Sequence, residues 1–162
     1  MRRFAFILAF LASACGFHPV LQARPEGKAV PAEMSHIMVS GIPNRSGQIL
    51  RNLLIDRFGK TADNPTYILD ITLAENIVNL GLKKDATATR AWLYLTSSFT
   101  LTRKSDGEIL LHGPARASAS YNILDSGYGS YITENDARKQ ALAVLSEGIT
   151  RRLALHFDRH AP

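Results

Sequence analysis

The stretch T-A-T-R-A-W-L-Y-L-T-S-S-F-T-L-T-R, residues 87–103, decides the fold of this chain. Apolar residues alternate along it with polar or aromatic ones. Because successive side chains of a β-strand point to opposite faces, the alternation predicts one long strand with a buried face and an outer face. The buried set is Ala91, Leu93, Leu95, Phe99 and Leu101, and the outer set is Arg90, Trp92, Tyr94, Thr96, Ser98, Thr100 and Thr102.

Two further strands are predicted beside the long one. Residues 66–73 alternate in the same way, and the S-D-G segment at 105–107 predicts a hairpin turn. A last strand is expected from Glu108, continuing past a Gly-Pro break at 113–114 as far as Tyr121. Antiparallel pairing of these three strands is expected.

Two amphipathic helices are predicted around these strands. The first follows a short strand at 36–42, with Asn44 or Ser46 as its cap and Gly59 as its stop. Its apolar face is Ile49, Leu50, Leu53, Leu54 and Phe58. The second closes the chain, with Thr133 as the expected N-cap. Its buried face is expected to be Ala137, Ala141, Val144, Leu145, Ile149 and Leu153.

These elements predict an α+β fold, a two-layer sandwich. Two helices pack on one face of a four-stranded mixed sheet, in the order β-α-β-β-β-α. The 162 residues fit a single domain, without internal repeats.

The start of the chain has the layout of a secretory signal peptide. Arg2 and Arg3 precede an apolar run that ends at Leu11, which is shorter than the roughly 20 residues that a membrane-spanning helix needs. Small residues then lead into Cys15, the only cysteine, and this resembles the lipobox of bacterial lipoproteins. The match departs from the usual pattern at Ala12, where a leucine is typical. Alternatively, this is an ordinary cleavage site that Cys15 happens to follow.

Acylation of Cys15 is the preferred interpretation, because a lone thiol in an exported protein would otherwise be exposed and reactive. The predicted organisation is a signal peptide at 1–14, a lipidated N-terminus and tether at 15–32, a domain at 33–157 and a tail at 158–162. Cleavage removes two of the 19 basic residues and none of the 14 acidic ones, which leaves a formal charge of 17 minus 14, or +3. This excess is too small to indicate nucleic-acid binding.

Patterns that would indicate catalysis are absent from the sequence. No nucleophile elbow, Cys/His pair or paired carboxylates occur, so no catalytic residues, cofactor or enzymatic activity are predicted. His156 and His160 are four residues apart but have no third ligand at metal-binding spacing, so no metal site is predicted. The G-Y-G-S segment at 127–130 is expected to be a loop, either mobile or protein-binding.

Three basic residues, Lys83, Lys84 and Arg90, lie at or near the start of the long strand. They are either ordinary solvated charges that protect a sheet edge or a site for lipid phosphates.

Several segments together resemble the LptE family of lipopolysaccharide-assembly lipoproteins. They are C-G-F at 15–17, the helix at 45–58, the long strand after D-A-T-A at 85–88, and the tail at 121–152 with E-N-D-A and I-T-R-R-L. The resemblance implies a plug and chaperone of the outer-membrane barrel LptD, anchored to the outer membrane, facing the periplasm and entering the barrel lumen.

The resemblance also implies direct lipopolysaccharide binding. Lys83 and Lys84 best match a family position for it, and Arg90 is a further candidate. An auxiliary lipoprotein of an envelope lipid transporter is the alternative function, and a hydrolase with a hidden site ranks last.

Overall fold

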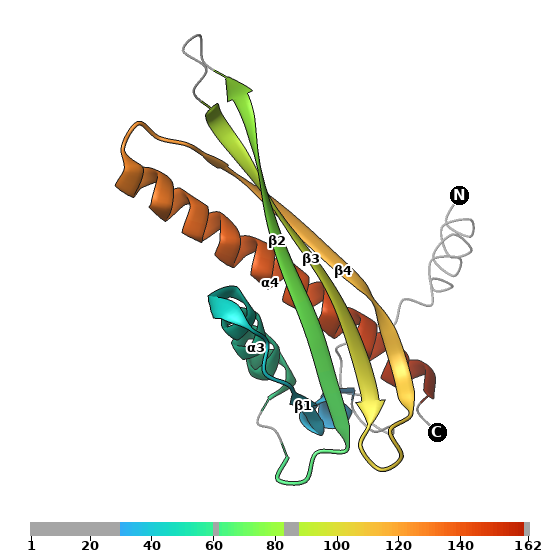
Figure 1. Ribbon diagram of the computed structural model, residues 1–162. Helices are drawn as coiled ribbons and strands as arrows, with labels where there is room; N and C mark the ends of the chain where they lie inside the picture. Colours follow the sequence, from blue (N-terminus) through green and yellow to red (C-terminus); the bar gives the residue numbers. More distant parts are fainter. Residues whose placement is uncertain (1–29, 60–61, 83–87, 161–162) are drawn as a thin grey trace, which may run out of the picture.

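The structure, a computed structural model, describes residues 30–59, 62–82 and 88–160 (Figure 1). The predictions for the signal peptide, for Cys15 and for Lys83 and Lys84 lie outside these residues. In chain order the elements are α2 (Val30–Ser35), β1 (Ile37–Val39), α3 (Asn44–Phe58), β2 (Tyr67–Leu82), β3 (Ala88–Arg103), β4 (Ile109–Asn122) and α4 (Gly127–His160).

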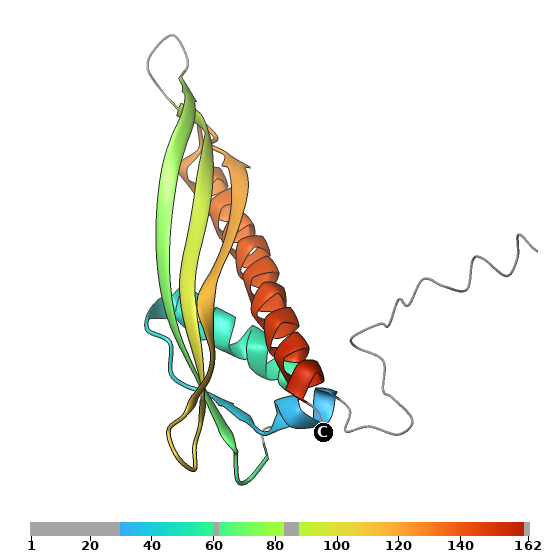
Figure 2. The same ribbon diagram turned by 90° about the vertical axis from the view of Figure 1, so that its right-hand side faces the viewer.

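The strands form one sheet in the order β1-β2-β3-β4. β1 runs parallel to β2, and the other neighbours are antiparallel. Figure 2 shows a strongly twisted, elongated sheet with α3 and α4 on one side and the other side open. The predicted α+β class, with helices on one face of a four-stranded mixed sheet, is therefore confirmed. The short helix α2 is an addition to the predicted order.

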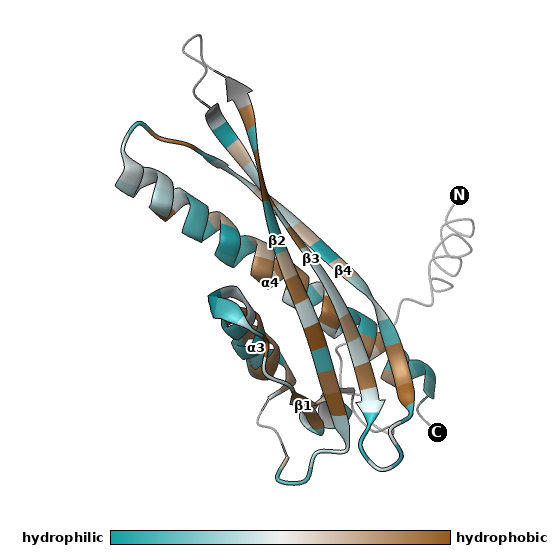
Figure 3. Ribbon diagram, viewed as in Figure 1, coloured by the Kyte–Doolittle hydropathy of each residue, from teal (hydrophilic) through white to brown (hydrophobic). Residues whose placement is uncertain are grey.

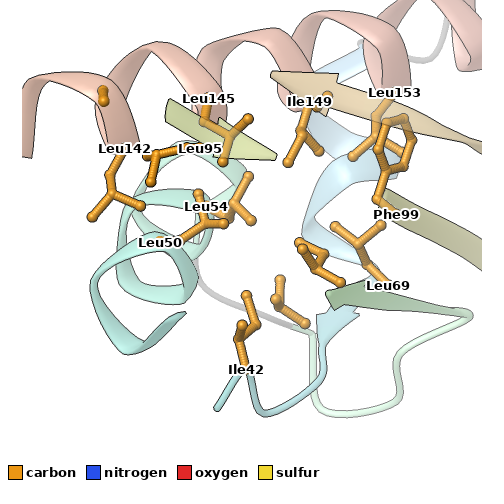
Figure 4. Packing of buried hydrophobic residues seen from close by; sticks show 14 of the residues in the cluster. Ile42, Leu50, Leu54, Leu69, Leu95, Phe99, Leu142, Leu145, Ile149 and Leu153 are labelled. Carbon is orange, nitrogen blue, oxygen red and sulfur yellow. The ribbon is translucent and has the colours of Figure 1, made fainter. Parts of the chain in front are cut away.

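The core lies between the sheet and the two long helices (Figure 4). Every residue of the predicted buried set of β3 is at most 1% exposed. From the helices, the fully buried large side chains are Leu50, Leu54, Leu142, Leu145, Ile149 and Leu153. Val144 was expected in this core but is 57% exposed, because Leu142 and Leu145 occupy the turn that faces the sheet.

The start of α4 corrects the prediction that Thr133 is the N-cap. The helix begins at Gly127, and Ser126 caps it, because its Oγ accepts a hydrogen bond from the Gly129 amide at 3.3 Å. Thr133 lies inside the helix and donates to the Ser130 carbonyl at 3.0 Å. The G-Y-G-S segment is thus the first helical turn and not a loop. Because this turn is largely exposed, it has no regularly spaced apolar residues that would have indicated a helix.

The start of α3 also differs from the prediction. Pro43 is the N-cap, and neither Asn44 nor Ser46 caps the helix, since no side-chain cap hydrogen bond is present. The predicted stop at Gly59 is confirmed. It has φ +83°, a backbone conformation that favours glycine, and its amide donates to the Ile55 carbonyl at 3.0 Å.

Strand lengths differ from the sequence expectation at three places. β1 is shorter than the expected 36–42, whereas β2 is twice as long as the expected 66–73. β4 passes through Gly113 and Pro114 without a break. Because β4 is an edge strand, Pro114 need not donate a ladder hydrogen bond on its free side. The ladder irregularity lies instead at Leu101 and Thr102.

Candidate functional site

The face of the sheet that points away from α3 and α4 is not covered by a helix (Figure 2). Its middle is rich in hydroxyl groups, and the Oγ atoms of Thr72 and Ser98 lie 2.8 Å apart across β2 and β3. The hydroxyl-bearing residues of this open sheet face are Thr72, Thr96, Ser98, Thr100, Thr102, Ser118 and Ser120. The surface therefore offers donors and acceptors along three strands.

Few charges interrupt the open sheet face. In the described parts of β2, β3 and β4, its carboxylate is Asp70, and its cations are Arg90 and Arg116. Figure 3 shows hydrophilic and hydrophobic residues interleaved along the three long strands, as expected for strands with one covered and one open face. A surface of this kind suits a polar, uncharged environment better than a strongly anionic one.

Arg90 lies at the far end of this face, near the β2–β3 connection. In the register it stands opposite Leu80 on β2 and Asn122 on β4, and it is exposed. Beside it, Trp92 and Tyr94 stack with their ring centroids 6.0 Å apart. Val78 and Leu80 add exposed apolar surface, so one end of the sheet combines a cation with aromatic and aliphatic side chains.

The helix side of the sheet carries a groove of about 550 Å³ between the start of α3, β2 and the first half of α4. Arg138 crosses it, donating to Glu75 of β2 at 3.2 Å and to Glu134 of its own helix at 2.6 Å. Its third contact is Asn135 at 3.0 Å. The guanidinium is therefore already satisfied by the protein.

Two further contacts involve residues of α4 that line this groove or lie next to those that do. Burial raises the pKa of Tyr121, and Glu134, which accepts its hydroxyl hydrogen bond at 3.3 Å, raises it further. Lys139 lies 3.5 Å from Asp136 on the surface.

Of the predicted lipopolysaccharide-binding residues, the structure describes Arg90 alone. Lys83 and Lys84 are in the chain between β2 and β3, outside the described residues. The aliphatic residues next to Arg90 were missed, because the second strand was expected to end at Leu73. Past that point both faces of β2 mix polar and apolar residues, so no simple alternation marks the strand.

Two negative findings concern the described residues only. Their His, Cys, Asp and Glu side chains do not form a group of three able to hold a metal ion. Among the described helices, none is both long and apolar enough to cross a membrane.

A family model described as LptE, lipopolysaccharide-assembly, matches residues 34–156. This range runs from the end of α2 almost to the end of α4 and includes the whole sheet. No curated protein sequence matches the chain.

Several solved structures share the fold. A provisionally assigned lipoprotein from Caulobacter crescentus CB15 aligns with a TM-score of 0.70 at 20% identity, covering 83% of this chain and 99% of that one. A minor lipoprotein from Acinetobacter baumannii gives a TM-score of 0.59 at 18% identity, with coverages of 79% and 95%. The rare lipoprotein B from Shewanella oneidensis gives 0.59 at 12% identity, with coverages of 76% and 96%. At these identities the likeness concerns the fold.

Proposed function

The chain belongs to the LptE family of lipopolysaccharide-assembly proteins, and from this membership we propose that it is a plug and chaperone of the LptD barrel. Its general role, lipopolysaccharide assembly by a non-enzymatic envelope lipoprotein, follows from the family. The barrel partner, direct lipopolysaccharide binding and location in the outer membrane are the finer parts of the proposal.

The open sheet face is the observation that carries the plug function. The interior of a wide outer-membrane barrel is polar and hydrated, so a protein inside it needs a surface that hydrogen-bonds without burying unpaired charge. A face whose middle is rich in hydroxyl side chains, with one described carboxylate, meets that need. The narrow, elongated shape in Figure 1 suits insertion along a barrel axis.

Lipopolysaccharide binding is proposed at the end of the sheet that carries Arg90, with Lys83 and Lys84 supplied by the adjoining connection. Lipopolysaccharide presents phosphates next to acyl chains, and cations beside Trp92 and Leu80 suit both parts. Charge-assisted hydrogen bonds to phosphate are about twice as strong as neutral ones.

The anchor is proposed to be Cys15, acylated with chains such as palmitate after the signal peptide is removed. Each buried methylene contributes about 0.8 kcal/mol, so more than one chain gives stable attachment. The expected result is a mature N-terminus at acylated Cys15 in intact-mass spectrometry. A mass that corresponds to an unmodified thiol would remove the anchor from the proposal.

Co-purification from detergent-solubilised envelopes tests the plug function. Tagged full-length protein should bring down an outer-membrane barrel in near-equal amount, and depletion of the protein should lower the amount of folded barrel. Recovery of the protein alone, together with normal barrel assembly after depletion, would contradict the proposal.

A charge reversal tests the lipopolysaccharide site separately. Arg90→Glu, and the double variant Lys83→Glu with Lys84→Glu, should weaken binding of purified lipopolysaccharide by about tenfold, or roughly 1.4 kcal/mol. Lys104→Glu makes the same charge change on the exposed β3–β4 turn and should bind like wild type. Equal losses in Arg90→Glu and Lys104→Glu would mean that only net charge matters.

An auxiliary lipoprotein of a lipid transporter is the second candidate, and the 550 Å³ groove beside Arg138 is the feature that favours it. That function predicts lipid bound in the groove of the isolated protein. Native mass spectrometry of protein purified without added lipid distinguishes the two.

A further inference from the structure

A second, smaller pocket lies at the opposite end of the molecule from Arg90, where the C-terminal turns of α4 cover the start of β4. Its volume is about 270 Å³. Five of its eight lining side chains are basic, none is acidic, and the other three are apolar. The lining consists of His112, Arg152, His156, Arg159, His160, Phe99, Leu111 and Leu155.

Two of the basic side chains around this basic pocket are held in position by contacts within the protein. Arg152 donates a hydrogen bond to the Pro114 carbonyl, and its guanidinium lies 6.0 Å from the centre of the Phe99 ring. The His160 Nδ1 is 2.8 Å from the His156 carbonyl, which can only accept, so Nδ1 carries the hydrogen. The Nε2 of His160 therefore remains for a ligand when the ring is neutral and becomes a donor when it is protonated.

Two carboxylates of the adjoining β3–β4 turn already have a partner there. Asp106 and Glu108 both bind Arg103, at 2.9 and 2.5 Å. The fold thus gathers two arginines and three histidines without placing a carboxylate in the lining.

Two of the histidines lie close together. The rings of His156 and His160 are 4.4 Å apart, and both burial and the neighbouring His160 lower the pKa of His156. A bound anion would reverse this effect, since a negative charge favours the protonated form of nearby histidines. The apolar side of the pocket, Phe99, Leu111 and Leu155, is unsuited to a fully hydrated ion and suits an amphiphile.

The basic pocket also lies at the end of the fold where the described chain begins. Helix α2, which starts at Val30, packs against α4 next to its C-terminal end (Figure 2). Val30 is 15 positions after Cys15 in the chain. A random-coil chain of that length has an r.m.s. reach of about 20 Å and a limit of about 50 Å. An anchor at Cys15 would keep this pocket within reach of the membrane surface.

We propose that this basic pocket binds the phosphate group of an anionic phospholipid from the membrane that carries the anchor. Arg152 and Arg159 contact the phosphate oxygens, the histidines donate when protonated, and the glycerol and first acyl carbons lie against Leu111 and Leu155. This goes beyond the proposed lipopolysaccharide site, which is at the other end of the sheet. That the phosphate comes from a membrane lipid rests on the proposed anchor at Cys15. The preference of the pocket for an anion rests on its basic lining and is independent of the anchor.

Titration calorimetry of the full-length protein in a neutral maltoside detergent tests the proposal. The probes are dihexanoyl phosphatidylglycerol, dihexanoyl phosphatidylcholine and inorganic phosphate. Phosphatidylglycerol should bind at least about tenfold tighter than phosphatidylcholine, because a cationic pocket repels the choline group. Inorganic phosphate should compete with phosphatidylglycerol but bind more weakly than it.

Matched variants locate the binding. Arg159→Gln should weaken phosphatidylglycerol binding by about tenfold, whereas Arg151→Gln, which removes an exposed neighbouring charge outside the pocket, should not. Arg90→Glu should also leave this affinity unchanged, even if it abolishes lipopolysaccharide binding. Circular dichroism of each variant confirms folding.

Three results would overturn the proposal. Equal binding of phosphatidylglycerol and phosphatidylcholine would exclude an anion site. Equal losses of phosphatidylglycerol affinity in Arg159→Gln and Arg151→Gln would show that binding depends on net charge and not on the pocket. Inorganic phosphate binding as tightly as phosphatidylglycerol would exclude the lipid as the specific ligand.

Discussion

At position 47 the fold leaves no room for a side chain larger than that of glycine. A Cβ placed there would lie 2.6 Å from Cγ2 and 2.8 Å from the carbonyl oxygen of Ile42. Because the carbonyl belongs to the backbone, the first turn of α3 would have to move. We expect Gly47→Ala to lower the free energy of unfolding by about 1–3 kcal/mol, as overpacking does. Urea denaturation followed by circular dichroism measures this.

Gly148 is the matched control, because it is also helical but a Cβ added there would meet nothing within 4 Å. Gly148→Ala should be neutral or should stabilise the protein by about 0.5–1 kcal/mol, since alanine is the better helix former. If both variants had the same effect, helix propensity and not the contact with Ile42 would be responsible.

His156 should make stability depend on pH. Burial and His160 lower its folded-state pKa, so the unfolded chain binds the proton more tightly. The free energy of unfolding contributed by this group is therefore complete above the unfolded pKa of about 6.5 and declines as the pH falls below it. The difference in urea midpoint between wild type and His156→Gln should shrink or change sign from about pH 8 to about pH 5. A difference that stayed constant would contradict the shifted pKa.

At the scale of elements, Arg138 joins α4 to the upper part of β2, which no other described ion pair does. Arg138 and Glu75 are only 18% and 27% exposed, so their attraction is less screened than that of a surface pair. A double-mutant cycle with Arg138→Gln and Glu75→Gln should give a coupling energy of about 1 kcal/mol.

The exposed pair of Lys139 and Asp136 provides the comparison for this cycle. Their side chains are 68% and 58% exposed, and the same cycle there should give about 0–0.5 kcal/mol. Equal coupling in the two cycles would show that the bridge from α4 to β2 adds nothing beyond a surface ion pair.

The same elements show why sequence reasoning succeeded in some places and failed in others. β3 was predicted accurately because it is central in the sheet, with one face against the helices throughout its middle, and burial enforces alternation there. The upper half of β2 and the first turns of α4 lack such cover, and Ile77 and Tyr131 are exposed. Where no face is covered, apolar residues do not recur at the spacing of a strand or a helix. The predicted strand end at Leu73 and the predicted helix start at Thr133 were therefore wrong.

The candidate sites were accessible from sequence to different degrees. Arg90 was predicted because it follows a basic pair at the start of a clearly patterned strand. The basic pocket was missed, because His112 and Arg152 are 40 positions apart and meet only through the packing of α4 on β4. The four-residue spacing of His156 and His160 was visible in the sequence. Which side chains surround them could not be predicted, because those neighbours come from distant parts of the chain.

At the scale of the whole molecule, the open sheet face is the surface proposed to lie inside the barrel. Ser118 is exposed in the edge strand β4, opposite Tyr94, so a large side chain there projects outward without entering the core. We expect Ser118→Trp to leave the free energy of unfolding within about 0.5 kcal/mol of wild type. We expect the same variant to reduce the amount of barrel that co-purifies, because barrel walls and plug must fit closely.

Ser105→Trp makes the same change in volume on the exposed β3–β4 turn, away from the open sheet face. It should co-purify with the barrel as wild type does. Quantitative immunoblotting of the barrel after affinity capture, normalised to the captured protein, measures both variants. If Ser118→Trp kept full co-purification while Ser105→Trp lost it, the turn and not the open sheet face would contact the barrel, and the orientation of the plug would be reversed.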